Sequence, residues 1–169
     1  TSVGQAVTVP TAFDSLDNAS EPIAEGVYQQ VLRNGSIGEV RKVCSDSAKF
    51  SLDERLRKLR DRLMVIAPFP QPVEVVIANA NALMVCKAPE SAQIVLNRFV
   101  PASGRQSREW LLMSWQAANA ALDHSRAALA LRRLVDGDLK DLDNERLIIG
   151  YGEDGSPFVR SGLDLLANH

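Results

Sequence analysis

A glycine-rich segment near the C-terminus is the first place in this sequence where chemistry could occur. Residues 150–155 have the spacing GxGxxG, and they follow a short apolar run at 146–149. A dinucleotide-binding fingerprint needs a helix to open directly after the glycines, so that backbone amides meet the pyrophosphate. Here a Ser-Pro pair follows, and Glu153 and Asp154 would repel a phosphate group. The segment therefore predicts a turn between two short strands, and no cofactor.

Histidine is the next residue type that could carry a reaction. His124 stands at the predicted start of a helix, where it could act as a base or a metal ligand. The only other histidine is His169, so neither has a second histidine at the spacing of a zinc site. The sequence also has no GxSxG turn that would present a serine nucleophile. We therefore predict a protein that is not an enzyme and holds no metal.

The two cysteines, Cys44 and Cys86, lie far apart in the sequence. They form no CxxC motif and no framework of several disulfides. Two interpretations stay open: two small buried hydrophobic residues, or a single bridge between them.

Side-chain amides within otherwise apolar segments are the best candidates for contacting a partner. A buried amide needs hydrogen-bond partners, so such residues usually face solvent or a ligand. These residues are Asn79, Asn81, Gln116 and Asn119. We predict partner contacts at Asn81, Gln116 and Asn119, and the alternative is a plain solvated stripe.

Two tryptophans accompany these amides. Trp110 and Trp115 are five residues apart, about 140° around a helix, so they point to different sides. One would then fill the core, while an exposed Trp115 would anchor a partner. Burial of both is the alternative.

Charge is unevenly spread along the chain, although the net charge is only −2. Residues 51–135 carry 12 Lys and Arg against 7 Asp and Glu, whereas residues 136–169 carry 3 against 8. This favours either solvated faces or an acidic tail that shields the basic middle. A basic helix at 51–66, with two helices before it, could also bind DNA. Acidic residues interrupt its basic face and no aromatic residue interleaves, so nucleic acid is not the favoured partner.

Composition and periodicity predict that helices position these residues. Aromatic residues make up only 5% of the chain, which favours helices over a sandwich or barrel. Ser20 is a candidate N-cap for a helix that stops at Asn34-Gly35 with a left-handed cap, and Ser36 would cap the next helix. Ser51 and Glu54 predict a capping box before a leucine-striped helix. Its stripe is Leu52, Leu56, Leu59 and Leu63.

The clearest pattern is a repeat within residues 73–135. A shift of 35 residues places 75–99 on 110–134, and each copy is a long helix, a short break and a second helix. Pro89 and Asp123 fit the starts of the second helices. Small residues, Ala92 and Ala127, would let the two helices of a pair approach closely. Other matched pairs are Ile94 with Leu129, Leu96 with Leu131, and Arg98 with Arg133.

Paired helices at a period near 34 residues are typical of a helical solenoid. The segment resembles tetratricopeptide repeats, with the family's alanine positions at Ala92 and Ala127 and its large apolar positions at Leu96 and Leu131. The resemblance implies a concave face formed by the first helices, where side-chain amides hold peptide backbones or terminal carboxylates. Asn81 and Gln116 would occupy equivalent places on that face.

These observations predict an all-α fold with tetratricopeptide-like helix pairs and a small irregular or β-hairpin C-terminal tail. Residues 1–19 would be an extended arm or linker, and 20–169 a single helical domain. We expect a non-catalytic interaction or scaffold module that binds a peptide or protein in a helical groove. The alternatives are a DNA-binding regulator that uses helices 20–66, and a helical accessory domain of a larger enzyme or envelope assembly.

Three further expectations concern membrane insertion, the length of the whole protein and its cellular compartment. No apolar run is long enough to span a membrane. The start at Thr1 and a helix that begins at Leu163 suggest part of a longer protein. A cytoplasmic location is slightly favoured, and an exported form would follow from removal of a signal peptide.

Overall fold

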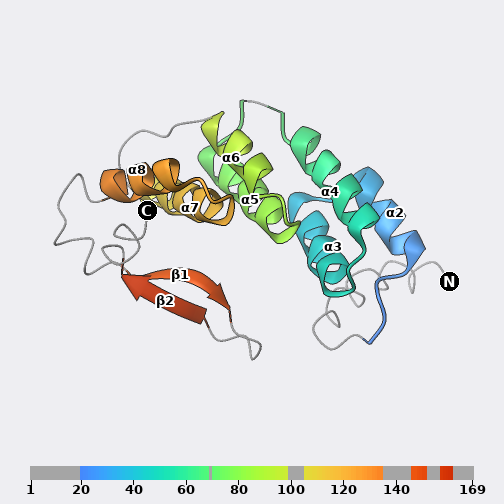
Figure 1. Ribbon diagram of the computed structural model, residues 1–169. Coiled ribbons are helices and arrows are strands. Elements are labelled where there is room, and N and C mark those ends of the chain that lie inside the picture. The colour runs from blue at the N-terminus through green and yellow to red at the C-terminus, as the bar shows by residue number, and fades with distance from the viewer. Residues whose placement is uncertain (1–19, 69, 99–104, 135–145, 152–156, 162–169) are drawn as a thin grey trace.

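The computed structural model of the protein describes residues 20–68, 70–98, 105–134, 146–151 and 157–161. Its described residues up to 134 contain helices and no strand, which confirms the all-α prediction for this part (Figure 1). The helices are α2 (Glu25–Asn34), α3 (Ile37–Lys49), α4 (Asp53–Ile66), α5 (Val73–Val85), α6 (Pro89–Asn97), α7 (Arg105–Ala120) and α8 (His124–Leu134). The predicted arm at 1–19 and the helix expected from Leu163 lie outside the described residues. None of the described helices is long and apolar enough to cross a membrane.

The start of α2 differs from the prediction. This helix begins at Glu25 with Ala24 as its N-cap, so the expected cap at Ser20 is wrong. The chain before α2 is instead fixed by Ile23, whose amide donates to the Asp46 carboxylate at 3.0 Å. The carbonyl of Ile23 accepts from the Arg55 guanidinium at 2.6 Å. Tertiary hydrogen bonds therefore override the local capping signal.

The end of α2 falls at Asn34, as predicted, but for a different reason. Gly35 has a φ of −67°, so it does not adopt the expected left-handed conformation. A Cβ at this position would lie 2.5 Å from the carbonyl oxygen of Val31. Glycine is needed here because the backbone passes so close to the preceding turn.

A capping box does occur, at the start of α3. The Ser36 hydroxyl accepts from the amide of Glu39, and the Glu39 carboxylate accepts from the amide of Ser36, at 3.2 and 3.1 Å. This confirms Ser36 as a cap and satisfies two orphan amides. The box predicted at Ser51 and Glu54 is wrong, because Ser51 belongs to the turn before α4 and has a positive φ.

Three helix pairs, α3–α4, α5–α6 and α7–α8, are joined by turns of the same kind. The middle residue of each turn is left-handed: Ser51 with φ 56°, Lys87 with φ 63° and Leu122 with φ 59°. The first two of these residues are 36 apart and the last two are 35 apart. These intervals are close to the 35-residue shift found in the sequence of residues 73–135.

The backbone hydrogen bonds of the three turns also correspond. The residue after each left-handed position donates to the carbonyl five residues earlier, which satisfies an orphan carbonyl at the end of the first helix. These bonds are Leu52 to Ser47 at 2.8 Å, Ala88 to Leu83 at 2.9 Å and Asp123 to Ala118 at 2.8 Å.

The pairs pack side by side in chain order. The first helices α3, α5 and α7 lie next to one another, and α6 also packs on α7. Figure 1 shows α3 and α5 below their partners α4 and α6 along a curved array. Ala92 and Ala127 are fully buried, which agrees with their predicted role at close helix approaches.

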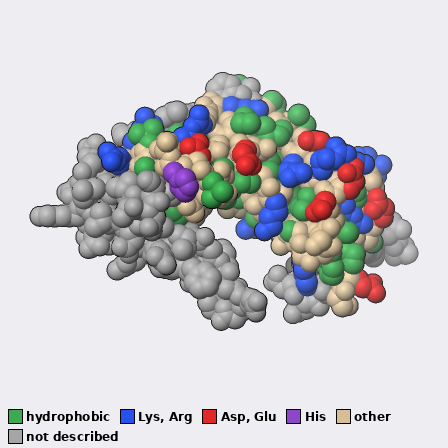
Figure 2. Space-filling view, viewed as in Figure 1, with side chains coloured by type: hydrophobic (Ala, Val, Ile, Leu, Met, Phe, Trp, Pro, Cys, Tyr) green, Lys and Arg blue, Asp and Glu red, His purple; other side chains and the backbone are tan. Residues whose placement is uncertain are grey.

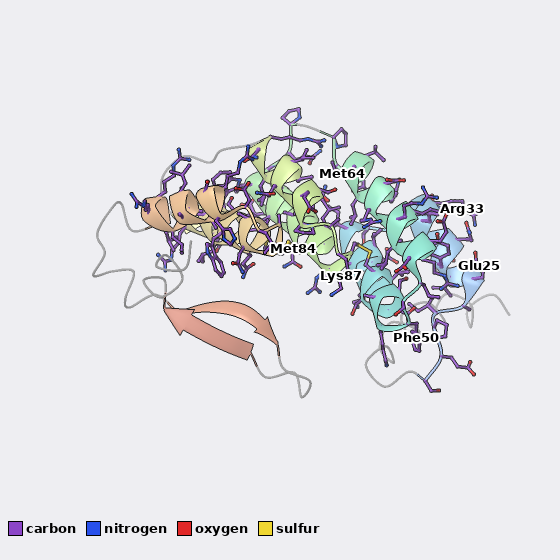
Figure 3. The ribbon with its side chains drawn as sticks, viewed as in Figure 1. Glu25, Arg33, Phe50, Met64, Met84 and Lys87 are labelled. Atoms are coloured by element: carbon purple, nitrogen blue, oxygen red, sulfur yellow. A yellow bond between two sulfur atoms is a disulfide. The ribbon has the colours of Figure 1, made fainter. Side chains whose placement is uncertain are left out.

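The core is divided into two clusters. The larger one runs from α2 through α7. The smaller one lies between α7 and α8 and contains Trp115, Ala127 and Leu131. Cys44 of α3 and Cys86 at the end of α5 form a disulfide within the larger cluster (Figure 3). This bond, left open by the sequence, joins two successive helix pairs covalently.

Hydrogen bonds also link each second helix to the next first helix. The side-chain amide of Asn79 on α5 donates to the carbonyl of Leu63 near the end of α4, at 3.0 Å. The indole of Trp110 on α7 donates to the carbonyl of Leu96 near the end of α6, at 3.0 Å. Carbonyls in the last turn of a helix lack intrahelical donors, so these side chains satisfy groups that would otherwise be buried and unpaired.

Two strands, β1 (Arg146–Tyr151) and β2 (Pro157–Ser161), pair antiparallel with Arg146 opposite Ser161. The register is irregular between Ile148 and Gly150. The glycine-rich segment thus leads from one strand to an antiparallel strand. A dinucleotide site would instead require a helix at this point.

Candidate functional site

The best candidate site is a polar stripe across the first helices of the three pairs. Counting back from each left-handed turn residue, Ser45, Asn81 and Gln116 occupy one equivalent position. One helical turn earlier, Arg41, Ile77 and Leu112 occupy another, and residues four apart share a helix face. We call these six residues the first-helix face. Arg41 and Ser45 are exposed, and the other four are half-buried.

A hydrogen bond joins this face across two helices. The guanidinium Nε of Arg41 on α3 donates to Oδ1 of Asn81 on α5, at 2.7 Å. The bond leaves the Asn81 amide group oriented with its nitrogen away from Arg41. The face therefore presents a cation, amide donors and the apolar side chains of Ile77 and Leu112 next to one another.

The two other predicted amides continue the face along α7. Gln116 and Asn119 are both half-buried, and among the described residues neither side-chain amide has a protein hydrogen-bond partner. Asn79, in contrast, is 2% exposed and is engaged with Leu63. Three of the four embedded amides thus lie at the surface, while Asn79 has a structural role.

Trp115 does not lie at the surface. Its side chain is 1% exposed and packs with Ala118, Ala127 and Leu131 in the smaller core cluster. The prediction of an exposed Trp115 is therefore wrong, because α8 packs on the side of α7 that carries this residue. Trp110 is 6% exposed, so both tryptophans belong to the interior.

Two of the five basic residues of α4, Arg55 and Arg57, form ion pairs within the protein. Arg55 pairs with Glu25 at 2.9 Å and stacks 4.7 Å from the centroid of the Tyr28 ring. Arg57 pairs with Glu54, and the resulting hydrogen bond raises the pKa of Arg57 and lowers that of Glu54. Guanidinium groups engaged in this way bind DNA phosphates less readily.

His124 is the first residue of α8 and is exposed. Within the described stretches, no group of three His, Cys, Asp or Glu side chains could hold a metal ion.

Asp123 links the last two helix pairs. Its Oδ1 accepts from the amide of Arg126 at 3.2 Å, which confirms it as the N-cap of α8, and its Oδ2 accepts from Gln93 of α6 at 3.1 Å. The bond from the Arg126 amide, followed by the one from Gln93, holds the pKa of Asp123 below its usual 3.8. The ionised carboxylate therefore helps to fix the spacing between α6 and α8.

Replacing Asp123 by asparagine is expected to flatten the pH dependence of stability at low pH. The folded-state pKa lies below the unfolded one, so the stabilisation is present above pH 3.8 and is lost as pH falls through the folded value. Asparagine can still cap the helix but does not titrate. Urea unfolding midpoints, measured from about pH 5 to about pH 2, should fall less in Asp123→Asn than in the parent. Equal slopes would show that Asp123 contributes nothing to acid sensitivity.

Sequence reasoning missed Arg41 and the third helix pair, and it left the disulfide open as one of two interpretations. The signal for the third pair is a shift of 36 residues, which places Val40 on Val76 and the buried Ser47 on Leu83. Arg41 and Asn81 are 40 residues apart, so only the packing of α3 on α5 brings them together.

Comparison with known proteins adds no relative: no family model, curated protein or solved structure matches the chain.

Proposed function

We propose that the protein is a non-catalytic interaction module that binds a peptide across the first-helix face of a tetratricopeptide-like array. The observation that carries this proposal is the recurrence of Ser45, Asn81 and Gln116 at one position of three adjoining helices. The family likeness is supported by the matching left-handed turns at intervals of 36 and 35 residues. It is also supported by the side-by-side packing of α3, α5 and α7.

The chemistry of the face fits an extended peptide. Side-chain amides can donate to and accept from a peptide backbone at once, which suits Asn81 and Gln116. Arg41 can pair with a carboxylate on the peptide, and Asn81 holds its guanidinium in place. Ile77 and Leu112 offer half-buried apolar contact between the amides. Binding of this kind needs shape, amides and a few anchors, and no reaction.

The test is selection of ligands from a display library of random peptides, followed by fluorescence polarisation with the selected peptides. The double variant Asn81→Ala/Gln116→Ala is expected to weaken binding about tenfold through lost hydrogen bonds. Asn97→Ala is the matched control, because Asn97 is an exposed amide on α6, outside the first-helix face. Affinity unchanged in the double variant, or no peptide selected by the parent protein, would refute the proposal.

Titration with duplex DNA at low salt tests the main alternative. A DNA-binding regulator would bind with an affinity that falls steeply as salt rises. We expect no such binding, because Arg55 and Arg57 are already engaged in ion pairs within the protein. Salt-sensitive DNA affinity that is lost in Lys58→Gln would favour the regulator instead.

A further inference from the structure

A cavity of about 440 Å³ opens between α6, α7 and α8, on residues outside the first-helix face. Its apolar lining includes Leu96, Trp110, Leu111 and Ala130. Leu129, also in the lining, has 46% of its surface exposed. Pockets of this size, mostly apolar with a few polar groups, are typical of small-molecule sites. Figure 2 shows hydrophobic and basic side chains side by side over α8.

The polar lining of the cavity is cationic or neutral. Arg126 and Arg133 stand two turns apart on α8, on either side of Leu129, and Gln93 and Asn97 lie one turn apart on α6. None of the described lining residues is a carboxylate. Asp123, which is outside the lining, pairs with Arg126 at 3.5 Å and accepts from Gln93 at 3.1 Å. Because Arg133 adds a second guanidinium, the lining favours an anionic group.

The equivalent space one repeat earlier is closed. A cavity of only about 10 Å³ lies there, lined by Ala67 and Gln71 before α5 and by Val75, Val76, Asn79, Val95 and Arg98. The last five of these residues have counterparts in the large cavity. Each counterpart lies 35 positions later in the sequence. The pairs are Val75 with Trp110, Val76 with Leu111, Asn79 with Ser114, Val95 with Ala130, and Arg98 with Arg133.

Four of the five positions change residue type: Trp110 and Leu111 are larger than their counterparts, whereas Ser114 and Ala130 are smaller and open the space. Asn79 fills the closed site and donates to Leu63, whereas Ser114 is shorter and its buried Oγ has no hydrogen-bond partner among the described residues. Val95 is likewise replaced by the smaller Ala130. The space is therefore almost filled in the smaller cavity and open between α6, α7 and α8, and an arginine occupies the corresponding position in both.

We infer that this cavity binds a small molecule with an apolar body and one anionic head, such as an aryl or acyl carboxylate. The apolar body would lie against Trp110 and Leu111, and the head would pair with Arg133 and Arg126. The inference is independent of the proposed peptide site, because none of the six residues of the first-helix face lines the cavity.

Two dyes that differ by one charge provide the test. Anilinonaphthalene sulfonate is anionic, and N-phenyl-1-naphthylamine has the same ring system without the sulfonate. We expect one bound sulfonate dye per folded chain, displaced by dodecanoate, and about tenfold weaker binding of the neutral dye. In Arg126→Gln/Arg133→Gln the difference between the two dyes should disappear. Arg98→Gln, the matched change in the closed site, should leave both affinities unchanged.

Closing the cavity provides a second readout. Ser114→Asn and Ala130→Val together restore the larger residues of the closed site at the two positions where the open cavity has smaller ones, so they should abolish dye binding while the far-ultraviolet circular dichroism stays helical. Unchanged dye affinity in this variant, equal affinity for both dyes in the parent, or no binding of either would overturn the inference.

Discussion

Replacing Cys44 and Cys86 together by alanine is expected to lower the free energy of unfolding by about 4 kcal/mol. The bond closes a loop with a sequence separation of 42, and a cross-link of that length removes much of the entropy of the unfolded chain. Urea unfolding followed by circular dichroism measures the change. The oxidised parent and the double variant should differ in midpoint and have similar helical content.

Reduction and the single variant supply the controls for this prediction. The parent protein unfolded in excess reductant should show the midpoint of the double variant, because both lack the cross-link. Cys44→Ala alone should cost nearly as much as the double change, since either removes the bond. A midpoint that is insensitive to reductant would mean that the two thiols are not joined.

The same bond bears on the compartment of the protein. Structural disulfides persist in oxidising environments and are rare in the cytosol, where thiols are kept reduced. Both sulfurs are fully buried, so folded protein should be reduced slowly and mainly after opening. The bond therefore shifts the expectation from the cytoplasm towards an oxidising compartment.

Trp115→Ala is expected to destabilise the protein by about 3–5 kcal/mol, because it empties a large buried volume between α7 and α8. If Trp115 were an exposed side chain, its replacement by alanine would instead change the free energy of unfolding by less than about 0.5 kcal/mol. Urea unfolding separates these outcomes. If the alanine variant does not fold, Trp115→Phe keeps the test open: it preserves most of the ring volume and removes an indole N–H that has no partner among the described residues. We expect the phenylalanine variant to be much closer to the parent.

The position of Trp115 illustrates what the sequence could and could not predict. Hydrophobic periodicity located the helices of the last two pairs, and the left-handed turns of these pairs are 35 residues apart, as in the predicted shift. The equivalent residues in the first two pairs are Cys44 and Ala80, which share neither size nor chemistry with a tryptophan. The side of α7 that carries Trp115 is covered because α8 packs against it. This burial depends on tertiary packing and could not be predicted from the local sequence.

Local signals failed where tertiary contacts outweighed them. The turn residues Ser51, Lys87 and Leu122 all adopt a conformation that usually favours glycine, so nothing in their types reveals the turns. Among the predicted site residues, Asn81 and Gln116 do lie at equivalent surface positions, because the repeat register was right. Arg41, which completes the face, has an apolar counterpart in both later copies and therefore left no repeat signal.

The division of the core into two clusters has a consequence for cooperativity. The larger cluster is cross-linked and shared by α2 to α7, whereas the smaller one is confined to the last pair. Stacked helix pairs touch mainly their neighbours, so the free energy of opening need not be uniform along such a chain. The amides of α8 should exchange with solvent through a partial opening that leaves the disulfide-linked pairs folded, which makes the last pair the place where ligands can most easily shift the protein's dynamics.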